Sequence, residues 1–154
     1  MQSPRLVPLD AGNWRDALAV RPHPEQLRFV AEFEPVALVI LAKAYVGARA
    51  LRWHPFAVTL DGDMVGLVGL AHPKPPGECE ICHLVIDVAH QNRGLGRAVL
   101  GLAADWARRE LPACRRLLLT VHPENAIARR LYEQAGFQPL GYERDGETVM
   151  ARAL

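Results

Sequence analysis

The sequence has few cysteines, few aromatic residues and almost no net charge, and these shortages exclude several classes of protein. Three cysteines in 154 residues are too few, and odd in number, for a disulfide framework. The formal net charge is +1, so no strong field attracts nucleic acid or an anionic membrane. We therefore expect neither a nucleic-acid partner nor a membrane partner.

Long apolar runs are also missing. The most apolar stretch, Pro35–Val46, is too short to cross a bilayer and contains Lys43, which predicts a core helix. The first residues, MQSPRLVPLDAGNWRD, lack the apolar region and the cleavage site of a signal peptide. We expect a cytoplasmic protein, and the length fits a single domain over residues 1–154.

The sequence does contain a regular succession of strand and helix patterns. Two Asp-Gly pairs, at Asp61 and Asp145, lie between β-rich runs and predict hairpins. In chain order we expect a strand at Arg5–Pro8, a helix from Asp10 to about Val20, a helix over roughly Pro35–Ala48, a hairpin within Pro55–Ala71, a strand at Glu80–Ile86, a helix from Leu95 to before Pro112, a strand at Arg116–Val121, a helix at Asn125–Gln134, and a hairpin of Phe137–Tyr142 with Glu147–Ala153. This order predicts an α/β domain around a mixed sheet.

The stretch CEICH, Cys79–His83, matches the C-x-x-C-H pattern of covalent haem attachment. On a strand, however, Cys79 and Cys82 point to opposite faces, so they cannot hold a haem or a zinc ion together. We interpret them as core cysteines and expect no haem and no metal.

The same alternation predicts where the polar residues of this strand point. Glu80 should share a face with Cys82, Leu84 and Ile86, within an otherwise apolar run. His83 should point to the opposite face, as a core histidine.

After this strand comes QNRGLGRA, Gln91–Ala98, where a helix is expected to begin. Two glycines leave backbone N–H groups accessible at a helix N-terminus, and Arg93 and Arg97 flank them, which indicates an anion site. Neither the P-loop spacing nor G-x-G-x-x-G fits, because Val99 stands where a third glycine would be required.

The segment Gln91–Gly96 resembles motif A (R/Q-x-x-G-x-G/A) of the GNAT superfamily, the N-acetyltransferases that use acetyl-coenzyme A. A second stretch, NAIARRLYEQAGF at Asn125–Phe137, is similar to the family's N-x-x-A-x-x-x-Y-x-x-x-G-F segment. The spacing between the two blocks is also typical of the family. The resemblance covers Glu80 to about Phe137, and it implies a GNAT-like mixed, mostly antiparallel twisted sheet with helices on both faces.

The resemblance also implies how acetyl-coenzyme A would bind. The backbone of Leu84–Ile86 would pair with the pantetheine arm, and the pyrophosphate would lie on the N–H groups of Asn92–Arg97, with charge-assisted contacts from the two arginines. Tyr132 would lie near the sulfur. The expected cofactor-binding residues are Leu84, Val85, Ile86, Gln91, Asn92, Arg93, Gly94, Leu95, Gly96, Arg97, Asn125 and Tyr132.

Transfer to an amine requires a base, because an alkylamine is almost wholly protonated at neutral pH and only its neutral form attacks a thioester. Glu80 lies eleven residues before Gln91, which is similar to the offset of the general-base glutamate in the histone acetyltransferase branch of the family. By the same resemblance, the backbone N–H of Ile86 is the expected oxyanion donor and Tyr132 the acid that protonates the leaving sulfur. The expected catalytic residues are thus Glu80, Tyr132 and Ile86.

The family resemblance does not determine the acceptor. The stretches HLVIDVAHQNRGLG, LYEQAGF and DGETVMARAL look closest to bacterial spermine/spermidine acetyltransferases, and Glu25, Glu32, Glu34 and Glu80 are available for a polycation. An amino acid, a drug or a protein N-terminus is an alternative acceptor. A coenzyme A sensor without chemistry is an alternative function. GNAT resemblance makes a homodimer the default expectation.

Overall fold

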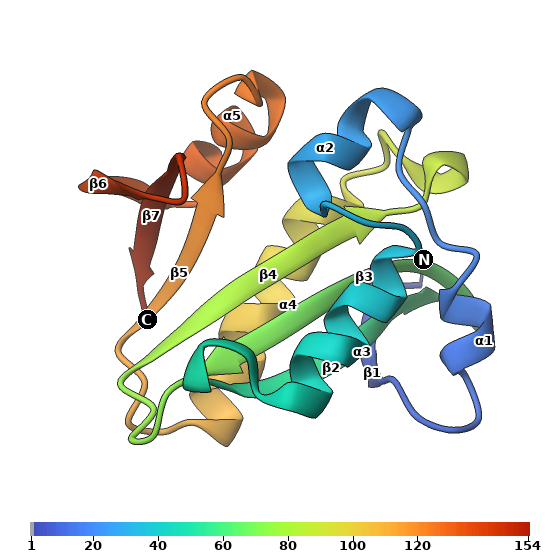
Figure 1. Ribbon diagram of the computed structural model, residues 1–154, viewed down its shortest axis with the longest axis horizontal. Coiled ribbons are helices and arrows are strands. Elements are labelled where there is room, and N and C mark those ends of the chain that lie inside the picture. The colour runs from blue at the N-terminus through green and yellow to red at the C-terminus, as the bar shows by residue number, and fades with distance from the viewer. Residues whose placement is uncertain (1) are drawn as a thin grey trace.

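The computed structural model describes residues 2–154, and its centre is a seven-stranded sheet in the order β1-β2-β3-β4-β5-β7-β6 (Figure 1). Neighbouring strands are antiparallel except for β4 and β5, which run parallel. The strands are β1 (Arg5–Pro8), β2 (Arg52–Leu60), β3 (Asp63–His72), β4 (Glu78–Ile86), β5 (Arg116–Val121), β6 (Gln138–Arg144) and β7 (Glu147–Ala153). The mixed, mostly antiparallel sheet confirms the predicted fold class.

Helices cover both faces of this sheet, as expected. One core lies between the sheet and α4, and a second lies between the opposite face and the helices α1 and α3 (Figure 1). The helices are α1 (Trp14–Ala17), α2 (Leu27–Val30), α3 (Val36–Val46), α4 (Leu95–Glu110) and α5 (Ala126–Gln134), with short 3₁₀ turns η1 (Pro24–Gln26), η2 (Ala48–Ala50) and η3 (Val88–His90). The three longer helices and both Asp-Gly hairpins lie where the sequence predicts them.

The helix expected from Asp10 to about Val20 is much shorter. Asp10 Oδ1 accepts hydrogen bonds from the backbone N–H groups of Gly12 and Asn13, at 2.8 and 3.1 Å, and Asn13 Oδ1 accepts from the N–H of Asp10 at 2.9 Å. These side chains compete with helical backbone bonds and close a turn instead. The helix therefore begins only at Trp14, and it ends at Ala17.

Strand β4 contains a bulge, which strict alternation along the sequence does not predict. Its register against β3 shifts between Leu67 and Gly69, and His83 adopts a φ of +54°. Gly66 allows the two strands to approach closely here, since a Cβ at this position would lie 2.5 Å from the carbonyl oxygen of Val85. A bulge adds one residue to a strand and reverses the facing of the side chains that follow.

The bulge divides the side chains of β4 into two groups. Before it, Cys79 packs in the core on the α4 side, whereas Glu80 and Cys82 face away from that core, as predicted. The two cysteines thus point to opposite faces, which confirms the geometry that argued against a shared haem or zinc ion. After the bulge, Leu84 and Ile86 pack against the α4-side core, so the prediction that they share the face of Glu80 is wrong.

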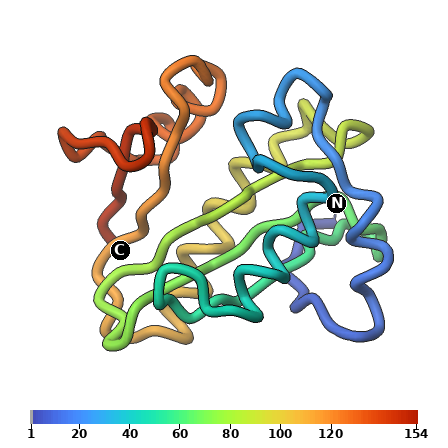
Figure 2. Tube along the Cα trace, viewed as in Figure 1, coloured from blue at the N-terminus to red at the C-terminus, as the bar shows by residue number. Residues whose placement is uncertain are grey.

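Strands β4 and β5 separate after only three paired positions. Their pairing runs from Glu78 opposite Arg116 to Glu80 opposite Leu118, and beyond this point the strands diverge (Figures 1 and 2). On the side of β5, the backbone of β4 after Glu80 therefore has no strand to pair with. This gap opens in the middle of the sheet, close to the start of α4.

A histidine pair lies on the α4 side of the sheet, away from this gap. Nε2 of His54 and Nε2 of His72 are 2.9 Å apart. Nδ1 of His72 donates to the carbonyl of Pro73 at 2.9 Å, so its Nε2 accepts the proton of His54. Burial, followed by His72 and Arg52, lowers the pKa of His54 from 6.5 to about 4, against a smaller opposing effect of Glu110.

The pair makes folding pH-dependent. Between pH 6.5 and about 4 the unfolded chain binds a proton at His54 that the folded chain does not, so stability falls as the pH is lowered through this range. We expect His54→Gln, which can still donate to His72, to give a flatter profile of unfolding free energy against pH. Urea denaturation at several pH values measures this difference. If the unfolding free energies of the two proteins changed with pH in parallel, His54 would not be the source of the pH dependence.

Candidate functional site

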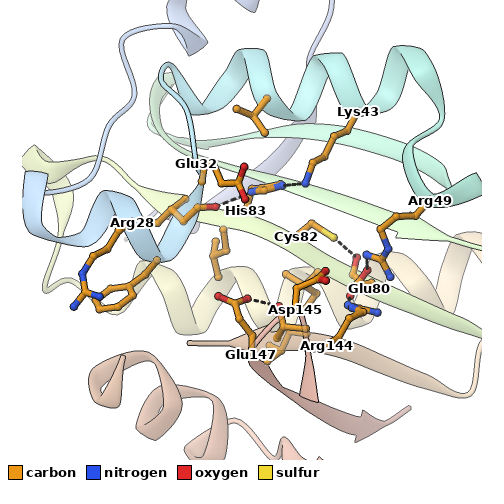
Figure 3. Close-up of a pocket in the computed structure, with 18 of the residues that line it drawn as sticks. Arg28, Glu32, Lys43, Arg49, Glu80, Cys82, His83, Arg144, Asp145 and Glu147 are labelled. Carbon is orange, nitrogen blue, oxygen red and sulfur yellow. Dashed lines mark hydrogen bonds and ion pairs between the residues drawn. The ribbon is translucent and has the colours of Figure 1, made fainter. Parts of the chain in front are cut away.

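A cavity of about 440 Å³ opens beside the gap between β4 and β5 (Figure 3). Its walls come from α2 and the residues that follow it, from α3, from β4 and β5, and from the β6–β7 hairpin. The charged residues that line it are Arg28, Glu32, Lys43, Arg49, Glu80, Arg144, Asp145 and Glu147. Cations and anions balance in this set, so its selectivity depends on which of these groups are already paired.

Glu80, the predicted base, lies in this cavity and is only 6% exposed. Its Oε2 accepts a hydrogen bond from Nη1 of Arg49 at 2.6 Å, and its Oε1 is paired with Nη2 of Arg144 (Figure 3). Two guanidinium groups favour the charged form of a carboxylate. The base role of Glu80 stays a prediction.

The two arginines reach Glu80 from distant parts of the chain. Arg49 lies in the turn after α3, where it adopts a φ of +59°, and Arg144 ends β6. The pair with Arg144 ties the β6–β7 hairpin to β4 on the cavity side of the gap.

His83 lies in the same cavity, so its prediction as a core histidine on the opposite face is wrong. Nδ1 is 2.7 Å from the carbonyl oxygen of Val30, and Nε2 is 2.8 Å from Nζ of Lys43. The imidazole stacks on the ring of Trp53, with centroids 6.5 Å apart. Burial and, as the smallest effect, the charge of Lys43 lower the pKa of His83, against the opposing hydrogen bond to Val30. Alternation missed this residue because the bulge lies at His83 itself.

Tyr132 of α5 lines the cavity, and its predicted place near the sulfur of the cofactor stays a prediction. Its ring packs edge-on against Phe137, with centroids 6.2 Å apart. Burial and, to a smaller extent, the charge of Glu147 raise the pKa of Tyr132 to about 12. The phenol is therefore protonated at neutral pH, as a proton donor must be.

The loop before α4 has the form that the sequence predicts. Gly94 adopts a φ of +74° and precedes the first helical residue, Leu95, and Asn92 adopts a φ of +64°. Arg93 and Arg97 are exposed, and within residues 2–154 neither forms an ion pair. The N–H groups of the first turn of a 16-residue helix and two available guanidinium groups suit an anionic ligand.

Gln91 and Asn125, both predicted to touch the cofactor, also have structural roles. The side-chain amide of Gln91 donates to Gln26 Oε1 at 2.8 Å and to the carbonyl of Ile86 at 3.0 Å, and so fixes the loop to the end of β4. Asn125 Oδ1 accepts from the N–H of Ala128 at 3.3 Å and caps α5. Their contacts with a cofactor stay predictions.

Three carboxylates on the cavity wall lack a cationic partner. They belong to Glu32, Asp145 and Glu147, none of which forms an ion pair within the part of the chain that the structure describes. Glu147 Oε1 accepts a hydrogen bond from the hydroxyl of Thr120 at 2.8 Å. These groups leave negative charge available on walls of the cavity that come from different elements.

Only part of this acidic set was predicted. Of the four acceptor carboxylates named from the sequence, Glu32 and Glu80 line the cavity, whereas Glu25 and Glu34 do not. The residues of the second Asp-Gly hairpin were missed, because their place in the cavity depends on the packing of β6 and β7 and not on a local pattern.

Two further findings bear on cofactors and membranes. Among residues 2–154, no cluster of three or more His, Cys, Asp and Glu side chains is arranged to hold a metal ion. No helix in the same range is long and apolar enough to cross a membrane.

Residues 17–137 match the model of the acetyltransferase (GNAT) family. This match covers most of the chain, which therefore belongs to the GNAT family of acetyltransferases. The predicted fold and family are both confirmed.

The relatives of this chain are named for different acetyltransferase activities. It is similar to the N-alpha-acetyltransferase RimI of Mycobacterium tuberculosis, with 34% identity over 102 residues that make up 65% of this chain and 55% of that protein. It is also similar to the spermine/spermidine N(1)-acetyltransferase of Bacillus subtilis, with 31% identity over 109 residues, or 66% and 71% of the two chains.

A solved structure supports the fold. The spermidine N-acetyltransferase of Vibrio cholerae, in complex with CoA and spermine, matches with a TM-score of 0.73 at 23% identity over 98% of this chain and 95% of that chain. The chain spans about half the length, or less, of three of the curated relatives that it matches.

Proposed function

We propose that the protein transfers the acetyl group of acetyl-coenzyme A to a primary amine, by direct attack and through a tetrahedral intermediate. The observation that carries this proposal is one cavity that Tyr132 lines and that borders the gap between β4 and β5, with the glycine loop of α4 close to that gap. Membership of an acetyltransferase family supports acetyl-coenzyme A as the donor.

The gap is suited to an extended pantetheine arm. The N–H of Asp87 donates to the carbonyl of Val65 on β3 at 2.8 Å. Because backbone groups alternate along a strand, the N–H of the preceding residue, Ile86, faces the other way, toward the gap. This direction supports pairing of Leu84–Ile86 with the arm, and it supports the N–H of Ile86 as the donor to the oxyanion that develops on the thioester carbonyl.

The loop over Asn92–Arg97 is suited to the pyrophosphate. The space beside the Cα of Gly94 is open, since a Cβ there would meet no atom within 4 Å. A phosphate can therefore approach the backbone closely. Arg93 and Arg97 of this loop would contribute charge-assisted hydrogen bonds to the phosphate.

A polyamine is the acceptor that we propose to test first. Glu32, Asp145 and Glu147, which form no ion pair among residues 2–154, would attract a substrate with several positive charges. One relative is named as a spermine/spermidine acetyltransferase. A protein N-terminus is the second candidate, because another relative is named as an N-alpha-acetyltransferase.

A panel of amines tests the proposed function, with thiol release from acetyl-coenzyme A as the readout. We expect spermidine and spermine to give the highest kcat/KM. Butylamine is the matched control, because it has one amine and no second charge. Its kcat/KM should be lower by on the order of tenfold for each ion pair that it cannot form, which corresponds to about 1.4 kcal/mol. Single amino acids, an aminoglycoside and a short peptide with a free N-terminus complete the panel.

Two outcomes would contradict this proposal at different levels. Preference for the peptide over spermidine would replace the polyamine by a protein N-terminus. Binding of acetyl-coenzyme A without thiol release for any amine would leave a coenzyme A sensor.

The homodimer also stays a prediction, and light scattering of the purified protein measures it.

A further inference from the structure

The proposed reaction needs a group that accepts a proton from the acceptor nitrogen, and the cavity contains a second candidate besides Glu80. Both oxygens of Glu80 are already engaged by Arg49 and Arg144. Each oxygen keeps a second lone pair, but two guanidinium groups favour the charged form of a carboxylate and so make it a weaker proton acceptor. His83, by contrast, is an imidazole on the wall of the same cavity.

The hydrogen bonds of His83 determine its tautomer. The carbonyl of Val30 can only accept, so Nδ1 of His83 carries the proton of the 2.7 Å contact. The ammonium group of Lys43 can only donate, so Nε2 is the bare nitrogen at the 2.8 Å contact. The backbone thus holds the imidazole in one orientation, as a third group does for the base of a catalytic triad.

The partner of Nε2 is itself informative, because it is a primary ammonium inside the cavity of an amine acetyltransferase. Lys43 reaches His83 from α3 (Figure 3). Its ammonium group also lies over the ring of Trp53, at 5.7 Å from the ring centroid. The lone pair of Nε2 is therefore directed at a point in the cavity where an amine nitrogen fits.

We propose that His83 is the proton acceptor of the reaction, and that the acceptor nitrogen takes the place of Lys43 at Nε2. Glu80 then acts as a fixed anion that holds Arg49 and Arg144 in place. The inference rests on the proposed function, since it assigns a group to that reaction.

The step conserves protons and electrons. The lone pair of the neutral amine forms the C–N bond with the thioester carbonyl carbon, and the nitrogen then loses one proton to Nε2 of His83. The C–S bond breaks with its electron pair on sulfur, which takes the proton of Tyr132. His83 releases its proton to water, and Tyr132 regains one from water. The net reaction converts amine and thioester into amide and thiol.

The charges around His83 bear on its titration. Lys43 on α3 and Arg28 on α2 are cationic, Glu32 after α2 is anionic, and Glu80 on the same strand is anionic. The remaining ionisable groups on the cavity wall are Arg49, Cys82, Tyr132, Arg144, Asp145 and Glu147. Lys43 contacts Nε2 of His83 directly, so removal of its positive charge should raise the pKa of His83.

The first test is the pH profile of kcat/KM for the best acceptor of the panel. Protonation of His83 removes the proton acceptor, so it adds one unit to the slope of log kcat/KM against pH on the acid side of the wild-type profile. This added slope lies below pH 6.5, because the pKa of His83 is lowered. Glutamine can keep both hydrogen bonds of His83 but cannot titrate. We therefore expect His83→Gln to lose this added slope and to lower kcat/KM at neutral pH by roughly 10²-fold.

Three further variants separate catalysis from structure. Lys43→Met should move the added slope to higher pH, because it removes the adjacent positive charge. Glu80→Gln should keep the slope, whatever its rate. His54→Gln is the control for the loss of a histidine, because the histidine pair lies away from the cavity. It should keep the wild-type pH profile of kcat/KM. An unchanged slope in His83→Gln, or its loss in Glu80→Gln, would overturn the proposal in favour of Glu80 or water.

A second readout does not depend on turnover. Nitrogen-15 NMR of labelled histidine in the free protein should show His83 with its proton on Nδ1 and a titration midpoint below that of an ordinary histidine. Lys43→Met should raise this midpoint. A proton on Nε2, or a midpoint that ignores Lys43, would overturn the assignment. Absence of thiol release by the wild-type protein would instead remove the proposed function.

Discussion

Tyr132→Phe is expected to lower kcat by roughly 10²-fold or more, with almost no change in melting temperature or in affinity for acetyl-coenzyme A. Collapse of the tetrahedral intermediate expels a thiolate, and a phenol beside the sulfur can supply its proton. Burial raises the pKa of Tyr132 to about 12, so the hydroxyl keeps its proton over the whole working range of pH.

The alternative is that Tyr132 only packs. Its ring contacts Phe137 edge-on, and phenylalanine preserves this contact while it removes the hydroxyl. A packing role therefore predicts full kcat, and that result would remove Tyr132 from the catalytic residues. Tyr142→Phe is the matched control, because Tyr142 lies on β6, is 53% exposed and does not line the cavity. Steady-state kinetics and thermal melting of both variants, with and without ligand, make the comparison.

Local sequence patterns predict most of the fold, because they report interactions within a few residues. Asp61 and Asp145 both adopt positive φ before a glycine, as Asp-Gly hairpin turns require. The apolar run Arg116–Val121 forms β5 with the bounds that the sequence predicts. The failure at Asp10 is also local, because two reciprocal side-chain bonds outweigh the helical propensity of the residues that follow.

The composition of the site depends on contacts that no local pattern contains. Arg49 and Arg144 meet on one carboxylate although 95 positions separate them in the chain. His83 faces the cavity because β3 and β4 pair with a register shift between Leu67 and Gly69, next to a close approach of the strands at Gly66. Motifs could therefore select Glu80 and Tyr132, which line the cavity, whereas the groups that surround them required the tertiary structure.

This difference matters most for proton transfer. A match to a family motif selects a glutamate by its offset from the glycine loop, but it does not reveal which cations hold that glutamate. The structure gives Glu80 two arginine partners, one on each oxygen, and it gives His83 one bare nitrogen, Nε2, in contact with Lys43. The identity of a residue and the groups that compete for its lone pairs are thus separate properties, and both are relevant to a base.

Replacement of Gly94 and Gly96 by valine is expected to abolish stabilisation by acetyl-coenzyme A. The wild-type protein should gain about 2.7 kcal/mol of unfolding free energy at a ligand concentration 100 times Kd. In the double variant, Cβ atoms would occupy the space through which phosphate reaches the backbone. Gly94 also has a φ of +74°, which disfavours any β-branched residue and would distort the loop.

Substitutions at Gly94 and Gly96 should destabilise the ligand-free protein to different extents, and this difference separates an effect on binding from an effect on folding. A Cβ at Gly94 meets no atom within 4 Å, whereas one at Gly96 would lie 3.3 Å from Cδ2 of Leu131 on α5. Gly94→Ala should therefore lose the stabilisation by acetyl-coenzyme A, and the ligand-free protein should be destabilised only by backbone strain at residue 94. Gly96→Ala should in addition disturb the packing of α5. The melting temperature of each variant with and without acetyl-coenzyme A measures these effects.

Gly101→Ala supplies the matched control, because Gly101 lies further along the same helix and its added Cβ also meets no atom within 4 Å. Alanine in a helix interior should stabilise the free protein by roughly 0.5–1 kcal/mol and leave the effect of the ligand intact. A folded double valine variant that gains as much from acetyl-coenzyme A as the wild type would show that the phosphates do not lie on this loop. The pyrophosphate site would then have to be sought elsewhere along the gap.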